Sequence, residues 1–315
     1  MLSRVAEALF WVGRYVERAE DTARLLDVHF HEVLEDPGVD EAHACAVLLA
    51  VMGVPGQTAA EHPDARSVLE LLGYDADSPS SIVGALSAAW RNARSAREAL
   101  SAEIWECLNS TRNSMAARVM AARDFGPAPF FSYVRERAAT VAGYVEASMS
   151  REAGYDALVL GRSLERVDMT ARLLAARVGA GQGSEGWTST LRACSAHDAY
   201  LRTYQQGVEA PRVVEFLLVD RLFPRSVFYA LQVGEGALAR LDPASGRSGL
   251  DERAHRAIGR ARTDLEFLST ARMLDGLPDR LFGLQRAVST ISEEVTQRLF
   301  VGSPPSLWSL KEPAA

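Results

Sequence analysis

Charged residues of the same types and spacing occur twice in this 315-residue chain, first around Gly13 and again around Gly161. A guanidinium presents a planar fork of donors that fits a carboxylate or a phosphate, so such residues can build an ion-pair network or an anion site. The repeated residues are Arg14, Glu17, Arg18 and Arg24 in the first copy and Arg162, Glu165, Arg166 and Arg172 in the second, with Glu20 and Asp168 as flanking acidic equivalents.

Three interpretations fit these charged residues. The first is a ladder along one helix, pairing Arg14 with Glu17 and Glu20 with Arg24, each pair contributing about 0.2–0.5 kcal/mol. The second is a buried network formed where the two repeated helices pack together. The third is an anion-binding site at their junction. Both copies use Arg and never Lys, although a solvated face could exchange the two at little cost.

A second candidate site lies around Pro224. Asp220, Arg225 and Ser226 flank this proline in a pattern typical of a helix start, whose free backbone N–H groups can hold an anion. The plainer alternative is an N-terminal cap in which Arg225 pairs with Asp220.

Motifs for other chemistry are weak. Residues 181–186 fit GxGxxG in form, but no strand precedes them. Glu252 and His255 give one Glu-x-x-His spacing, whereas a di-iron bundle needs two. The histidines form no HExxH motif, and neither GxSxG nor a Walker loop occurs. We therefore predict no metal and no cofactor, and no catalytic nucleophile can be named.

The repeated charges lie on stretches with helical period. Apolar residues spaced three and four apart run from Val5 to Phe30 and recur from Ala153 to Val178, so each copy has an apolar seam beside its charged face. Between Val12–Leu26 and Leu160–Leu174, nine of fifteen positions are identical, where about one would match by chance. These stretches are therefore an internal duplication.

The duplication extends beyond this helix. Residues 68–86 align with residues 213–231 without a gap, at nearly the same offset. We predict an all-α helical bundle built from two pseudo-symmetric repeated halves, residues 1–149 and 150–315, integrated into one domain.

The other segments are predicted to be helical as well, including Leu69–Leu72 and Val213–Val219. In the second half, Gly234 and Gly236 are predicted to interrupt what the first half keeps as one long helix, and the loop that follows could be a lid or only a surface connection. The expected helices include 3–35, 42–52, 85–125 with a break near Asn109, 130–149, 187–204, 250–274 and 280–300.

Composition limits the class of protein. A hydrophobic content of 48% and a charged content of 24% are typical of a soluble globular protein, and the net charge of −7 argues against a nucleic-acid surface. Three separated cysteines indicate neither disulfides nor zinc, and Arg4 and Glu7 argue against a signal peptide. No run approaches the ~20 apolar residues of a membrane span. We expect a cytoplasmic protein that binds neither nucleic acid nor membrane.

Five segments also carry a family resemblance: Met1–Arg4, Trp11–Glu20, Glu103–Asn109, Gly161–Leu174 and Phe216–Ser226. In this order, over nearly the full chain, they resemble the alpha-E domain family, a bacterial, all-helical family named for its Glu-Arg motifs. Glu17-Arg18 and Glu165-Arg166 are the matching motif residues.

The resemblance implies partners for this chain. Members of the family are encoded beside, or fused to, circularly permuted ATP-grasp ligases and transglutaminase-like cysteine peptidases. This implies an accessory role in making or modifying a peptide or amide-linked product, with the Arg/Glu face binding the ligase or an acidic peptide. Two alternatives are an enzyme acting on a carboxylate or phosphate substrate between the halves, and a purely structural duplication.

Overall fold

A computed structural model of the chain describes residues 3–35, 40–54, 63–179, 184–243, 252–269 and 272–300. Within these ranges the chain is helical and contains no strand, which confirms the predicted all-α class. The α-helices are α1 (Ser3–Glu35), α2 (Glu41–Val51), α3 (Ala65–Val68), α4 (Ile82–Ser95), α5 (Ala102–Phe125), α6 (Ala128–Ser148), α7 (Ala153–Gly179), α8 (Ser184–Ala193), α9 (His197–Tyr204), α10 (Ala210–Val219), α11 (Val227–Leu241), α12 (Arg253–Glu266) and α13 (Leu277–Leu299).

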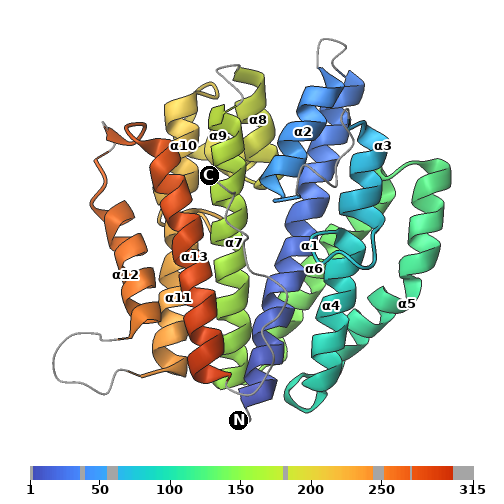
Figure 1. Ribbon diagram of the computed structural model, residues 1–315, viewed down its shortest axis with the longest axis vertical. Helices are drawn as coiled ribbons and strands as arrows, with labels where there is room; N and C mark the ends of the chain where they lie inside the picture. Colours follow the sequence, from blue (N-terminus) through green and yellow to red (C-terminus); the bar gives the residue numbers. More distant parts are fainter. Residues whose placement is uncertain are drawn as a thin grey trace.

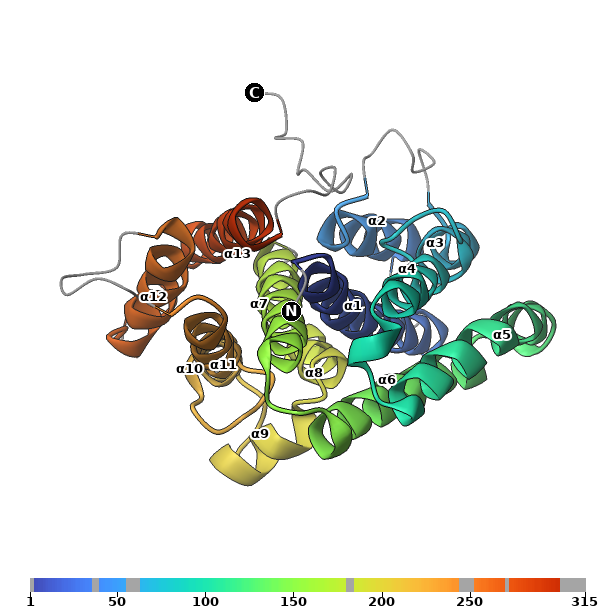
Figure 2. The same ribbon diagram turned by 90° about the horizontal axis from the view of Figure 1, so that it is seen from below.

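The two long helices that carry the repeated residues, α1 and α7, lie side by side at the centre of the bundle (Figures 1 and 2). Helices α4 and α6 pack on α1, while α11 and α13 pack on α7. The apolar seam of α1 is buried, with Leu9 and Val12 completely inaccessible, and so is that of α7, where Leu160 and Val167 are inaccessible. The sequence period therefore identifies the faces that hold the core together.

Two glycines allow α1 and α7 to approach closely. A Cβ atom on Gly13 would lie 2.1 Å from the carbonyl oxygen of Leu158, and one on Gly161 would lie 2.0 Å from that of Phe10. Any larger residue at either position would push the helix backbones apart. The charged residues one turn further along each helix therefore meet across the contact.

Equivalent local features occur around the second sequence match. Ser81 caps α4 and Ser226 caps α11, each accepting a hydrogen bond from a backbone N–H three residues later. Their hydroxyl groups donate to the carbonyl oxygens of Asp75 and Asp220, respectively. These pairs support the prediction of two pseudo-symmetric halves, which stays a prediction.

The helix break predicted near Asn109 is wrong. Helix α4 ends at Ser95, a 3₁₀ turn covers Arg97–Ala99, and α5 then runs through Asn109. The new helix starts here because the Ser101 side chain accepts a hydrogen bond from the backbone N–H of Ile104, at 3.4 Å.

The second half also differs from the predicted helices. The segment 187–204 is divided between α8 and α9, because Ser195 has a left-handed backbone with φ of 53°. Helix α12 ends at Glu266 rather than at residue 274, while residues 250 and 251 lie outside the described ranges.

Helix α11 continues to Leu241 through Gly234 and Gly236, which were predicted to interrupt it. A Cβ atom on Gly234 would lie 3.3 Å from both Ile258 and Ser163, so this glycine serves close helix packing instead of ending the helix. The proposed lid segment, and the glycine-rich segment after α7, fall largely outside the described residues.

None of the described helices is both long enough and apolar enough to cross a lipid bilayer.

Candidate functional site

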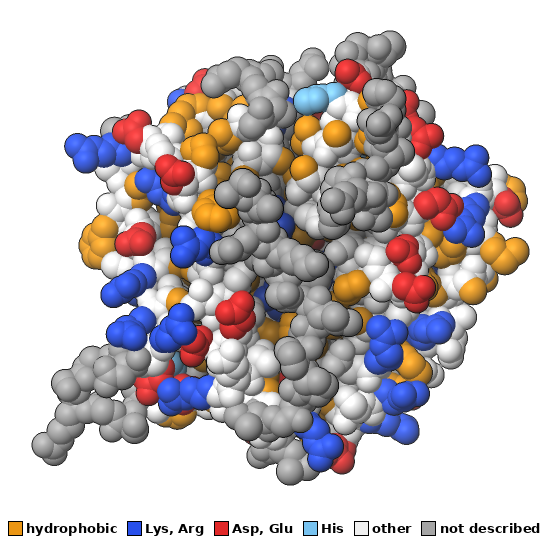
Figure 3. All heavy atoms as spheres, in the orientation of Figure 1, with side chains coloured by type: hydrophobic (Ala, Val, Ile, Leu, Met, Phe, Trp, Pro, Cys, Tyr) orange, Lys and Arg blue, Asp and Glu red, His pale blue; other side chains and the backbone are white. Residues whose placement is uncertain are grey.

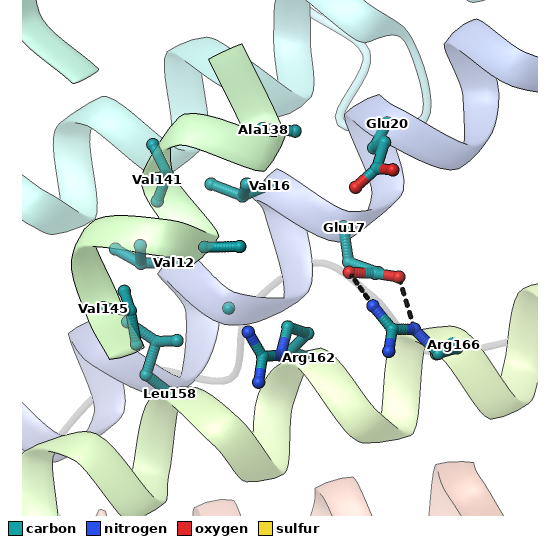
Figure 4. Close-up of a pocket in the computed structure, with 12 residues that line it drawn as sticks. Val12, Val16, Glu17, Glu20, Ala138, Val141, Val145, Leu158, Arg162 and Arg166 are labelled. Carbon is teal, nitrogen blue, oxygen red and sulfur yellow. Dashed lines mark hydrogen bonds and ion pairs between the residues drawn. The ribbon is translucent and has the colours of Figure 1, made fainter. Parts of the chain in front are cut away.

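The two Glu-Arg dipeptides pair with each other across the contact between α1 and α7. Glu17 accepts hydrogen bonds from Nε and Nη2 of Arg166, at 2.7 and 2.9 Å (Figure 4). Glu165 accepts from Nε and Nη2 of Arg18, at 2.5 and 2.8 Å. Each dipeptide thus gives its carboxylate to the other's guanidinium, in the two-point geometry that suits this pair of groups.

Glu165 is shared by two arginines of α1. Besides the Arg18 contacts, it accepts from Nε of Arg14 at 2.6 Å, and Arg14 also donates to Ser292 of α13 at 2.8 Å. Glu165 is 0% exposed, and both arginines are 3% exposed. Burial alone would raise the pKa of Glu165, but the Arg18 and Arg14 charges outweigh it and hold that pKa below its usual value.

Glu17 also contacts a second arginine, Arg225. By the repeat this second arginine would be Arg162, the counterpart of Arg14. Arg225, just before α11, lies 3.1 Å from Glu17 and also contacts Glu20 at 2.6 Å and Asp21 at 2.5 Å. Against the effect of burial, Arg166 and Arg225 lower the pKa of Glu17 from 4.5 to about 2. This carboxylate stabilises the fold above its unfolded pKa, and the contribution is lost as the pH falls toward 2.

Asp21 behaves in the opposite way. Burial, together with the charges of Glu17 and Glu20, raises its pKa from 3.8 to about 7, although Arg225 opposes the shift. Three carboxylates share the Arg225 guanidinium, so one of them gains least from ionising. The cluster therefore carries a carboxyl group that exchanges its proton near neutral pH.

Replacing Asp21 by Asn should remove a pH dependence of stability. Asp21 holds its proton up to about pH 7 in the folded state and releases it above 3.8 when unfolded. Stability should therefore fall across this window as the pH rises, by at most about 1.4 kcal/mol per unit. Asn keeps an oxygen that accepts from Arg225 but has no proton to lose. Urea unfolding of Asp21→Asn and the parent between about pH 5 and pH 8 should show the parent's slope flattened, whereas parallel curves would contradict the assignment.

Arg162 departs from the pattern of its repeat counterpart, Arg14. Among the described residues its hydrogen-bond partner is Glu146 of α6, contacted through Nη2 at 3.2 Å. Its guanidinium faces a cavity of about 40 Å³ enclosed by α1, α6 and α7 (Figure 4). Arg162 also helps to lower the pKa of Glu17, so it remains in electrostatic reach of the pair that it does not join.

The intrahelical pairs were only partly predicted. Arg24 binds Glu20 at 2.7 Å, and Arg172 binds Asp168 at 2.8 Å, both four residues apart. The predicted pair of Arg14 with Glu17 is wrong, because α1 and α7 lie close enough for Arg14 to reach Glu165 instead.

The second candidate site is a helix cap. Ser226 caps α11 as predicted, and its hydroxyl accepts from the backbone N–H of Tyr229 at 3.1 Å. The predicted pair of Arg225 with Asp220 is wrong. The Asp220 carboxylate accepts from the backbone N–H groups of Leu222 and Phe223 at 2.9 and 2.7 Å, which leaves Arg225 to reach α1.

The sequence did not predict Asp21 as a site residue, nor that Arg225 contacts three carboxylates of α1. Asp21 aligns with Met169 in the repeat, and Arg225 aligns with Ser80. Because the aligned residues differ in type, a comparison of the two copies does not identify either Asp21 or Arg225. The one available signal was the acidic run formed by Glu20 and Asp21, which needs a nearby cation once it is buried.

Within the described ranges, no three His, Cys, Asp or Glu residues are grouped so as to hold a metal ion. Cys45, Cys107 and Cys194 are free and buried, and burial raises the pKa of the Cys194 thiol to about 12. A thiol with so high a pKa is a poor nucleophile at neutral pH.

Comparison with known proteins gives a family and a set of relatives. A family model described as a predicted alpha-helical domain with a conserved ER motif matches residues 1–300. The chain is similar to the uncharacterized proteins Mb2597 of Mycobacterium bovis and Rv2567 of Mycobacterium tuberculosis, with 27% identity over 335 residues. The match covers 97% of this chain but 38% of each relative. No solved structure was found to match the chain.

Proposed function

The chain belongs to the Alpha-E family, whose description names a conserved ER motif, and from that premise we propose that it is a non-catalytic, accessory helical module of an ATP-grasp ligase-associated system that forms peptide or amide bonds. In this proposal the ER motif itself binds no partner. It acts as a cross-brace, which we define as the pairs Glu17–Arg166 and Arg18–Glu165 together with Arg14 and Arg225.

One observation carries this proposal: the motif side chains are occupied by one another. A catalytic acid or base, or an anion-binding guanidinium, must be available to a ligand. Glu165 instead accepts from two guanidiniums while completely buried, and Glu17 accepts from Arg166 while 3% exposed. The pairing weighs against an enzyme site built from these residues and supports a structural role for them.

Burial also moves the expected partner contact away from the motif. Arg14 was expected to bind the ligase directly, but at 3% exposure it cannot be part of an interface while α1 and α7 remain packed. The chain also matches only 38% of the length of its relatives, which is consistent with a module that works beside other domains.

We propose that the ligase binds to the segment between α10 and α11 and to the end of α12. Leu222 and Phe267 are 87% and 80% exposed there, and their neighbours Arg221 and Glu266 are joined by an ion pair at 3.1 Å. Large exposed apolar side chains on two segments that an ion pair joins are typical of a protein interface.

The test is copurification with a circularly permuted ATP-grasp ligase, the kind of partner that the family resemblance implies. The parent protein should form a complex that survives size-exclusion chromatography, and Leu222→Ser/Phe267→Ser should weaken it at least about tenfold. The control is Phe125→Ser, because Phe125 is 85% exposed but lies at the end of α5, on the other flank of the bundle (Figure 1). If the parent forms no complex with the ligase, the proposal is wrong.

A further inference from the structure

Of the two repeat-related arginines Arg14 and Arg162, the cross-brace leaves out Arg162. Its counterpart Arg14 donates to Glu165 and Ser292 and is 3% exposed. By the repeat, Arg162 should bind Glu17 in the same way. Arg225 has taken that position at 3.1 Å, and the residue aligned with Arg225 in the first half is Ser80, so no equivalent displacement can occur there.

The contact that Arg162 does make is of a kind that exchanges readily. Its partner Glu146 has a side chain that is 47% exposed, and the distance is 3.2 Å. The same carboxylate also accepts from Arg151 at 3.1 Å and from Tyr155. An ion pair open to water on one side contributes about 0–1 kcal/mol, so a competing carboxylate can replace Glu146 at small cost.

The cavity beside Arg162 is small. Its volume is about 40 Å³, whereas about 10–15 Å³ is enough to hold one water molecule, so a group of the size of a carboxylate can enter it. The walls are mainly apolar side chains of α1, α6 and α7, and Figure 4 shows the Arg162 guanidinium among them. They are Val12, Val16, Val141, Val145 and Leu158.

The charges around the cavity favour a single negative charge. With the exposed pair of Glu146 and Arg151 left aside, seven guanidiniums face five carboxyl groups in and beside the cross-brace, an excess of at least two positive charges. The guanidiniums are those of Arg14, Arg18, Arg24, Arg162, Arg166, Arg172 and Arg225, and the carboxyl groups are those of Glu17, Glu20, Asp21, Glu165 and Asp168. This excess lies inside a chain whose net charge is −7. A phosphate dianion would meet the buried carboxylates of Glu17 and Glu20, which line the same cavity, so a monovalent carboxylate fits better.

We propose that the Arg162 cavity binds the carboxylate of a small apolar acid or of a peptide C-terminus, which replaces Glu146 on the guanidinium. The head group lies against Arg162, a small apolar group next to it contacts Val141 and Val145, and the rest of the ligand extends past Glu146 to solvent. This inference deepens the proposed function, because a peptide carboxylate is what an amide-forming system consumes or produces.

Binding of N-acetyl-alanine, followed by isothermal titration calorimetry and NMR line shifts, tests the site. The parent protein should bind it, while Arg162→Ala should weaken binding at least about tenfold. Glu146→Gln should strengthen binding, because it removes the internal competitor. Ala142→Leu, which fills the cavity without changing a charge, should block binding.

Two controls make the outcome specific. Arg123→Ala removes an arginine whose partner Glu70 is similarly exposed, with a 44% exposed side chain, and which lies outside the cavity, so binding should be unchanged. N-acetyl-alaninamide and inorganic phosphate should bind at least about tenfold more weakly than N-acetyl-alanine. Propionate and an N-terminally capped peptide with a free C-terminus then distinguish the two ligand sources.

The site is refuted if Arg162→Ala binds as well as the parent while keeping its thermal unfolding temperature, if the amide binds equally, or if phosphate is preferred. Glu146→Gln is the control for misfolding, because a misfolded variant would not bind N-acetyl-alanine more tightly than the parent. If the protein forms the ligase complex but does not bind the carboxylate, only the Arg162 site is refuted. If it binds the carboxylate but forms no ligase complex, only the accessory role is refuted.

Discussion

Glu165→Gln is expected to lower the free energy of unfolding by about 3–5 kcal/mol, the usual cost of removing one partner from a buried ion pair. The substitution keeps the shape of the side chain but removes the negative charge that Arg14 and Arg18, each 3% exposed, both contact. Urea unfolding followed by circular dichroism at neutral pH measures the effect.

The matched control is Glu70→Gln. Glu70 also binds an arginine, Arg123, with two hydrogen bonds at 3.1 and 2.5 Å, but both side chains are about half exposed. Its loss should cost less than about 1 kcal/mol. Similar costs for the two substitutions would mean that burial of the cross-brace has no energetic consequence.

Gly13→Ala and Gly161→Ala should each destabilise the protein by about 1–3 kcal/mol. The added methyl carbon would lie 2.1 Å from the Leu158 carbonyl oxygen in the first case and 2.0 Å from that of Phe10 in the second. Both obstacles are helix backbone, so neither can rotate away, and α1 and α7 must separate. The separation also lengthens the cross-brace, which adds to the cost.

Gly143→Ala provides the control for helix propensity. Gly143 lies inside α6, and a Cβ atom there would meet nothing within 4 Å. Since Ala is the better helix former, this substitution should stabilise the protein by about 0.5–1 kcal/mol. Chemical unfolding of the three variants side by side separates the steric effect from the conformational one, and equal signs for all three would contradict the close approach of α1 and α7.

The fold class could be predicted from the sequence because apolar spacing determines which face of a helix is buried. The seam from Val5 to Phe30 leads directly to the central position of α1. The helix ends could not be predicted as well, since they depend on local caps and tertiary packing. Ser101 starts a helix without any nearby glycine or proline, and Gly234 lies inside α11 because Ile258 packs against it.

The candidate site was predictable only where the two copies agree. The repeat identified Glu17, Arg18, Glu165 and Arg166, and the structure brings these four together. The repeat could not identify Asp21 or Arg225, because each aligns with a residue of a different type in the other copy. Those differences are what free Arg162 from the cross-brace.

The use of Arg instead of Lys in the motif carries less information than the sequence first indicates. Lysine and arginine together number 34, and Lys311 is the single lysine, so arginine is the cation throughout the chain. The significance of the motif comes from its geometry, which matches each guanidinium to a carboxylate of the other helix.

Exposed and buried charges have different roles in this protein. On the face shown in Figure 3, arginines and acidic residues are spread over the flanks formed by α11–α13 and by α4 and α5. Such exposed charges contribute little to stability. The buried charges of the cross-brace instead favour one register of α1 against α7, because a slip along the helix would leave charges unpaired.

The coupling free energy between Arg18 and Glu165 tests this role most directly. A double-mutant cycle of Arg18→Met and Glu165→Gln, measured by urea unfolding, should give a coupling of about 2 kcal/mol or more if the two side chains brace the helices against each other. A coupling within about 0.5 kcal/mol of zero would contradict it, because independent side chains cannot hold α1 and α7 in register.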